Sequence, residues 1–375
     1  MTDPTFVPGL ELCGAFYREE VLPILRSEFP ALVHSAGILG TGSEVAGFDD
    51  ATSTDHHWGP RVMLFLSEVD LRREGERLHE MLAQELPTTF MGYSTNFGPP
   101  DAGGGGRLLI PVEGPPIAHR VEMASVSGYF TSMLGFDPTA GIADEDWLFV
   151  PSQRLHELTA GAVFHDGLET LEAARAALRW YPRDVWLYLI GHQWQRIAEE
   201  EPFVGRCAEN GDELGSRVVA GRLVRDVMRL CFLLERRYAT YSKWLGSAFS
   251  RLECAGVAGP MLESAMAAQD FAAREEALCA AYEAVAGMHN ELGITAAVDP
   301  TVRLFYGRPF RVLRAERFAE AAFAEMEAGV RAKLEPVLGS IDQWGDSTWL
   351  LSRPLQWRRL RSAYFGEREL LAVGR

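Results

Sequence analysis

The chain has 375 residues, of which 47% are hydrophobic and 23% charged, a composition typical of globular proteins and unlike that of fibrous or disordered chains. Its formal net charge of −16 excludes the broad, sequence-independent binding of nucleic acid that Lys and Arg provide. The first thirty residues carry no signal-peptide pattern, no apolar run approaches about 18 residues, and the five cysteines form no CxxC pair. We therefore expect a cytoplasmic protein without a membrane span.

The first 130 residues predict a mixed α/β domain. Helical spacing of apolar positions extends over residues 8–28, with Pro23 as a kink, and again over residues 71–86. Short apolar or alternating runs predict four strands, at residues 31–40, 61–67, 88–97 and 117–126.

The pattern changes at about residue 131. Long segments with helical period and helix-forming composition follow, among them residues 183–201 and 213–245. The sequence thus predicts an α+β protein of two domains, an α/β domain at 1–130 and a helical bundle at 131–375.

Residues 40–67 contain the most informative pattern, because glycines, a serine and several acids lie between two predicted strands. Gly42 and Ser43 follow the first strand, where backbone amides can approach a phosphate closely, and we expect a short helix to begin at Glu44 with its N-terminus toward that anion. Asp55 stands before the second strand, where its carboxylate can hold a magnesium ion opposite the phosphates. In an extended segment Asp55 and His57 share one face.

The order of a strand, Gly-Ser, about ten residues and then Asp-x-acid resembles the nucleotidyltransferase superfamily. More narrowly, GSEVAGFDD and STDHHWGPR resemble an uncharacterised bacterial family of nucleotidyltransferase-like proteins, a domain of unknown function, and this resemblance continues over most of residues 30–250. It implies a nucleotidyltransferase-type mixed sheet in which Gly42 and Ser43 bind the triphosphate and Asp55 is the first metal ligand.

The resemblance also implies roles for three further residues. His57 stands where the superfamily has a second carboxylate; imidazole suits zinc or manganese better than magnesium, so this departure puts ordinary two-magnesium catalysis in question. Glu122 is the candidate third metal ligand, with an ordinary surface ion pair to Arg120 as the alternative. Lys243 stands where related transferases place a phosphate-contacting lysine, with a snorkelling surface lysine as the alternative.

The remaining candidates favour structural roles. We expect Asp49 and Asp50 to cap a turn or short helix, and His165 and Asp166 to end an apolar helix as a cap rather than to form a catalytic pair. We expect Trp186, Trp194 and Phe203 to pack in the core of the helical bundle rather than to stack on a nucleotide base. The basic run at Arg353, Arg358, Arg359 and Arg361 predicts a solvated helix face, with phosphate contact as the alternative.

The leading hypothesis is a nucleotidyltransferase-like enzyme that uses Mg²⁺ or Mn²⁺ and an NTP, with ATP as the expected nucleotide. It would transfer a nucleoside monophosphate to a hydroxyl on an unknown small-molecule or protein acceptor. One alternative is a catalytically degenerate nucleotidyltransferase fold that serves as a nucleotide-binding, regulatory or interaction module. The other is a helical-domain binding protein unrelated to nucleotides.

Overall fold

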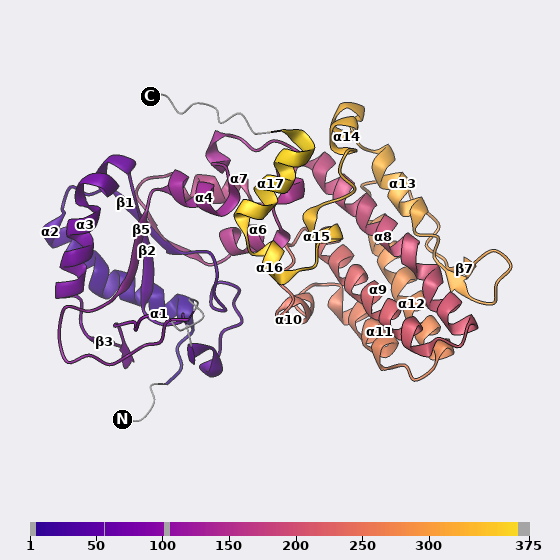
Figure 1. Cartoon of the computed structure of the whole chain (residues 1–375), viewed down its shortest axis with the longest axis horizontal. Coiled ribbons are helices and arrows are strands. Elements are labelled where there is room, and N and C mark those ends of the chain that lie inside the picture. The colour runs from indigo at the N-terminus through magenta and orange to yellow at the C-terminus, as the bar shows by residue number, and fades with distance from the viewer. Residues whose placement is uncertain (1–4, 56, 101–105, 367–375) are drawn as a thin grey trace. The chain divides into compact units, whose positions relative to one another are not determined.

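The computed structural model describes residues 5–55, 57–100 and 106–366, except for the side chain of Asp55 (Figure 1). The protein is mixed α+β, with a small mixed sheet and a helical C-terminal region. It divides into two compact units, Met1–Ile142 with Arg154–Arg179 and Ala143–Gln153 with Trp180–Arg375. The division at 130/131 that the sequence suggests lies inside helix α4 (Val126–Leu134).

The predicted opening helix is present and passes through a wider turn in its middle. It consists of α1 (Gly9–Phe16), the π-helical turn η1 (Tyr17–Val21) and α2 (Leu22–Glu28). Pro23 lies in the first turn of α2, so the wider turn comes directly before the residue that lacks a backbone N–H and crowds the preceding turn. Pro23 therefore modifies the helix without ending it.

A four-stranded mixed sheet forms the centre of the first unit, in the order β5 (Arg120–Ala124), β2 (Arg61–Leu66), β1 (His34–Ile38) and β6 (Ala162–Asp166). Strand β1 is antiparallel to both β2 and β6, whereas β2 and β5 are parallel. The predicted strands at 31–40, 61–67 and 117–126 are confirmed.

The two faces of the sheet differ in chemistry because side chains alternate along each strand. Val62, Leu64 and Val121 belong to a core that includes Leu12 and Phe16 of α1. The core also includes Leu78 and Leu82 of α3 (Glu68–Glu85), the predicted helix at 71–86. The opposite face carries three pairs of neighbouring residues, Arg61 with Arg120, Met63 with Glu122 and Phe65 with Ala124. Polar groups of two strands are thereby placed on one face.

The predicted strand at 88–97 is wrong in form. The segment makes a two-residue hairpin, with β3 (Thr89–Phe90) paired to β4 (Tyr93–Ser94). Met91 and Gly92 between them have φ angles of 47° and 83°, the left-handed conformations that reverse a chain in such a turn.

The expectation that His165 and Asp166 end a helix is also wrong. Both lie in β6, which pairs with β1 and belongs to the first unit. Asp166 accepts hydrogen bonds from the Ser35 hydroxyl at 2.5 Å and from the Glu172 amide at 2.9 Å, so it does cap a helix, but the following one, α7 (Leu171–Ala177). The remaining elements of this unit include η3 (Pro138–Ala140) and most of α6 (Ser152–Thr159).

Antiparallel and crossing helices dominate the second unit. The longest are α8 (Arg183–Glu209), α9 (Glu213–Leu234), α11 (Ala255–Ala267) and α12 (Phe271–Glu291), which lie side by side in Figure 1. Trp186 and Trp194 are buried as predicted, whereas Phe203 is 44% exposed and is not core.

Shorter elements complete the second unit. The helices are α5 (Asp146–Phe149), α10 (Leu245–Phe249), α13 (Glu316–Ala324), α14 (Ala328–Leu334), α15 (Ile341–Trp344), α16 (Thr348–Leu351) and α17 (Pro354–Phe365). The strands β7 (Arg303–Leu304) and β8 (Arg311–Val312) form a separate hairpin. Within the described ranges, no helix combines the length and apolar character needed to span a bilayer.

Candidate functional site

The loop after β1 is a compact turn. The amide of Ala46 donates to the carbonyl of Gly42 and the amide of Phe48 to that of Ser43, at 3.3 and 2.9 Å. The short helix expected from Glu44 is wrong: the turn covers residues 43–47 and ends at Gly47, whose φ of 69° is incompatible with a further helical turn.

Gly42 is required by its surroundings. Its φ is 147°, and a Cβ atom at this position would lie 2.5 Å from a carboxylate oxygen of Glu44. The space that the glycine leaves open is therefore taken by the Glu44 side chain. Among the described residues, the amides of Ser43 and Glu44 donate no hydrogen bond, which leaves them as possible donors to an anion.

Arg61 and Glu44 form a buried ion pair that ties this loop to β2. The Arg61 Nε donates to Glu44 Oε1 at 2.9 Å, and its Nη2 donates to the Thr41 carbonyl at 3.1 Å. Both residues are buried. Burial is the largest single influence and would lower the pKa of Arg61, but the attraction and hydrogen bond of Glu44, together with Cys13 and Glu122, raise that pKa, so the guanidinium stays charged.

Sequence reasoning overlooked this pair. The signal that identifies it is an arginine at the head of an otherwise apolar run, because a buried charge needs a partner.

Asp55 and His57 lie in irregular structure before β2. Residues Ala51–Asp55 form the 3₁₀ helix η2, and Asp50 caps it as predicted, by accepting hydrogen bonds from the amides of Thr52 and Ser53. The extended segment expected there is wrong, since His57 has a φ of 58° and β2 begins only at Arg61. The side chain of Asp55 lies outside the described part, so its metal-binding role stays a prediction.

Arg120 brings two of the predicted site residues together. Its Nη1 donates to the Nδ1 of His57 at 3.0 Å, and its Nη2 and Nε donate to Oε1 of Glu122 at 2.6 and 3.2 Å. Accepting from a guanidinium makes His57 Nδ1 unprotonated. The Arg120–Glu122 ion pair considered as the alternative role of Glu122 is formed.

A cationic guanidinium thus stands between the two donors predicted to share a metal. In the described ranges, no three His, Cys, Asp or Glu side chains are grouped closely enough to hold an ion. The contacts of His57 and Glu122 in this arrangement therefore do not fit a shared divalent cation, which would have to displace Arg120. The Mg²⁺ or Mn²⁺ ion stays a prediction.

Lys243 belongs to the second unit. It is exposed, and its ammonium lies 4.9 Å from the centre of the Trp244 ring. Its exposure and its aromatic neighbour agree with a surface lysine. Its proposed phosphate contact stays a prediction.

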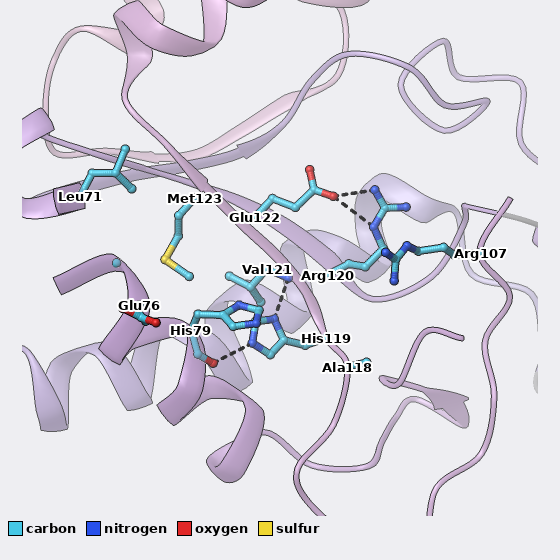
Figure 2. Close-up of a pocket in the computed structure, with 11 residues that line it drawn as sticks. Leu71, Glu76, His79, Arg107, Ala118, His119, Arg120, Val121, Glu122 and Met123 are labelled. Atoms are coloured by element: carbon cyan, nitrogen blue, oxygen red, sulfur yellow. Dashed lines mark hydrogen bonds and ion pairs between the residues drawn. The ribbon is translucent and has the colours of Figure 1, made fainter. Parts of the chain in front are cut away.

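A pocket of about 710 Å³, here called the β5 pocket, opens beside β5 and α3 in the first unit (Figure 2). Residues from these elements and from the segment that precedes β5 line it: Leu71, Gly75, Glu76, His79, Arg107, Ala118, His119, Arg120, Val121, Glu122 and Met123. Glu122 and Arg120 thus belong both to the cluster with His57 and to the pocket.

His119 is a fixed part of the pocket wall. Its Nδ1 accepts the amide hydrogen of Val121 and its Nε2 donates to the carbonyl of His79, both at 3.1 Å. Burial lowers the pKa of His119 to about 4, so it is neutral at pH 7. Both ring nitrogens are engaged, so His119 acts as a support rather than a metal ligand.

The candidate site of the first unit thus combines three features: the glycine turn at residues 42–43, arginines on two neighbouring strands, and the β5 pocket at the edge of the sheet. Residues 147–245 match the family model described as Domain of unknown function (DUF4037). This match contains β6, α8, α9 and Lys243, but not the loop at 40–48. None of the curated proteins matches the chain. The resemblance to nucleotidyltransferases stays a prediction from the sequence.

Proposed function

We propose that the first unit binds a nucleoside triphosphate at the Gly42–Ser43 turn and transfers its nucleoside monophosphate to a hydroxyl acceptor. The acceptor oxygen would form a bond to the α-phosphorus, the bond to the β-phosphate oxygen would break, and pyrophosphate would leave while the hydroxyl proton passes to solvent. A cytoplasmic location belongs to this proposal and agrees with five free cysteines, four of them buried.

One observation carries the proposal. The parallel register of β2 and β5 sets Arg61 beside Arg120 and Met63 beside Glu122, on the face of the sheet to which the Gly42–Ser43 turn is bound through Glu44. Backbone amides of the turn, cationic side chains and one exposed carboxylate are thereby grouped in one region. Phosphoryl transfer depends on such positioning and electrostatic stabilisation more than on covalent help.

A second candidate is nucleotide binding without transfer, as in a degenerate regulatory module. The bond between Arg120 and His57 favours it, because a guanidinium between His57 and Glu122 supports an anion and opposes a metal ion. Nucleotide binding is common to both candidates, and turnover separates them.

Nucleotide binding is tested by calorimetric titration of the full chain with ATP, with and without Mg²⁺ or Mn²⁺. We expect saturable binding that weakens in Asp55→Ala if the carboxylate acts through a metal. The control is Glu80→Ala, which changes an exposed residue of α3, and it should bind nucleotide like the wild type. Absence of binding in every condition would overturn both candidates.

Transfer is tested by pyrophosphate release in the presence of candidate acceptors. Under the transferase proposal, wild type releases pyrophosphate and Glu122→Gln does not. Turnover that appears only in His57→Asp would instead support the degenerate module, because that change restores a carboxylate at the position where the superfamily has one.

A further inference from the structure

One side of the β5 pocket carries two arginines, although its lining as a whole contains two arginines and two glutamates. Arg107 and Arg120 both line it, and Figure 2 shows their side chains on the same side of the pocket. Within the described ranges, the Arg107 guanidinium makes one long hydrogen bond, from Nη1 to the Gly98 carbonyl at 3.4 Å, and no ion pair with a carboxylate. In the part of the chain that the structure describes, no carboxylate therefore pairs with this guanidinium.

Arg120 is held rigidly beside it. Three of the five N–H groups of its guanidinium serve Glu122 and His57, which leaves two for a ligand. The guanidinium also lies 5.7 Å from the centre of the Phe97 ring, which restricts its movement. Two guanidinium groups, one of them fixed in place, are a typical arrangement for binding a phosphate or a carboxylate.

The rest of the pocket suits an organic body. Leu71 and Met123 supply apolar surface, and Glu76 and His79 of α3 supply polar groups away from the arginines in Figure 2. A volume of about 710 Å³ lies within the range of about 300 to 1,000 Å³ found for small-molecule sites and is much larger than a free phosphate needs.

We propose that the β5 pocket binds a small organic molecule that carries a phosphate or carboxylate group, held by Arg107 and Arg120, and that this molecule is the hydroxyl acceptor. The assignment of this molecule as the hydroxyl acceptor rests on the proposed function, whereas the binding of an anionic molecule in the pocket does not. Glu122 connects the two sites, since it lines the pocket and also lies on the same face of the sheet as Arg61, beside Met63.

Binding is tested with phenyl phosphate as the probe, by calorimetry on the full chain, with benzoate as the carboxylate counterpart. We expect Arg107→Ala to weaken binding of whichever probe binds by about tenfold or more, because a charge-assisted hydrogen bond is lost. Arg107→Lys should keep part of the affinity. Arg72→Ala, which removes an exposed arginine of α3 outside the pocket, is the control and should bind like the wild type.

A second variant tests the pocket without removing a charge. Gly75 lines the pocket from α3, and a Cβ atom there would meet only Leu71 at an ordinary 3.4 Å, so Gly75→Leu should fold and fill the cavity. It should weaken phenyl phosphate several-fold and leave inorganic phosphate unchanged. Equal binding of the probes by wild type, Arg107→Ala and Gly75→Leu would overturn the inference.

Competition separates this inference from the proposed function. Saturating ATP should leave the affinity for phenyl phosphate within about twofold if the pocket is the acceptor side. Displacement by ATP would overturn the acceptor assignment, because the two arginines would then belong to the nucleotide. Probe binding without any ATP binding would support the pocket and refute the proposed function.

Discussion

Arg61 and Glu44 form a deeply buried ion pair near the candidate site, with side chains that are only 10% and 3% exposed. Removing one member of such a pair leaves an uncompensated buried charge. We expect Arg61→Ala to lower the free energy of unfolding by about 3 to 5 kcal/mol, measured by urea denaturation.

Two further variants show whether the loss of stability in Arg61→Ala comes from an unpaired buried charge. Arg72→Ala, which breaks an exposed pair with Glu68, should change the free energy of unfolding by less than about 1 kcal/mol. The double change Glu44→Leu with Arg61→Leu should recover much of the loss, because no unpaired charge remains. A small effect of Arg61→Ala, similar to that of Arg72→Ala, would show that the pair is not buried in solution.

Glu201 of α8 gives a prediction about pH. It accepts hydrogen bonds from the amides of Leu313 and Ala315 at 2.6 and 3.0 Å, and burial raises its pKa from 4.5 to about 7 despite these bonds. The folded protein therefore holds this proton more tightly than the unfolded chain. Its stabilising contribution is fully present below pH 4.5 and is lost as the pH rises through 7.

The test compares wild type with Glu201→Gln in denaturation at several pH values. The wild type should lose up to about 1.4 kcal/mol of unfolding free energy per pH unit relative to the variant between pH 4.5 and 7. The comparison with the variant matters because buried histidines such as His289, with a pKa lowered to about 4 by burial, change stability in the opposite direction. Parallel pH profiles would contradict the raised pKa of Glu201.

At the scale of elements, the hairpin between β3 and β4 contains a residue that its backbone does not favour. Met91 has a φ of 47° and a side chain that is 47% exposed, so it is strained without packing in return. Met91→Asn should raise the free energy of unfolding by about 0.5 to 1 kcal/mol, because Asn adopts the left-handed region readily. Met91→Val should lower it, since a β-branched side chain is least tolerated there.

The same residue explains one limit of sequence reasoning. Long periodic segments such as α3 and α8, and continuous apolar runs such as β2, were predictable because burial on one face or both leaves a pattern. The sequence predicts one strand at this hairpin because its turn begins with methionine rather than the asparagine, aspartate or glycine that identifies such turns.

Strand β6 shows a second limit. Its five residues, AVFHD, are too short to distinguish a strand from a helix end by period, and its pairing with β1 joins residues more than 120 positions apart. At the site, residue types alone predicted the glycine turn and singled out Glu122 as a candidate functional residue. The Arg120–Glu122 ion pair was also expected as an alternative, but the proximity of Arg107 and the β5 pocket were not, because they depend on the parallel register of β5 and on the packing of α3.

At the scale of the whole molecule, the first unit is discontinuous along the chain. It requires Arg154–Arg179, which supply β6 and α7, and it excludes Ala143–Gln153. A fragment of residues 1–130 would cut through α4 and leave β1 as an unpaired edge of the sheet. We expect this fragment to lack a cooperative unfolding transition by circular dichroism.

A fragment of residues 1–179 contains every strand of the four-stranded sheet and should unfold cooperatively, with amides of β1 protected from hydrogen exchange because β2 and β6 both pair with it. It also exposes buried residues of the second unit, Trp147, Leu148 and Phe149, so Leu148→Ser with Phe149→Ser is a useful companion change to limit association. If residues 1–130 alone unfold as cooperatively as 1–179, then β6 is dispensable and the continuous domain expected from the sequence is the better description. If only the longer fragment folds, the strand contributed by residues 162–166 completes the unit that carries the candidate site.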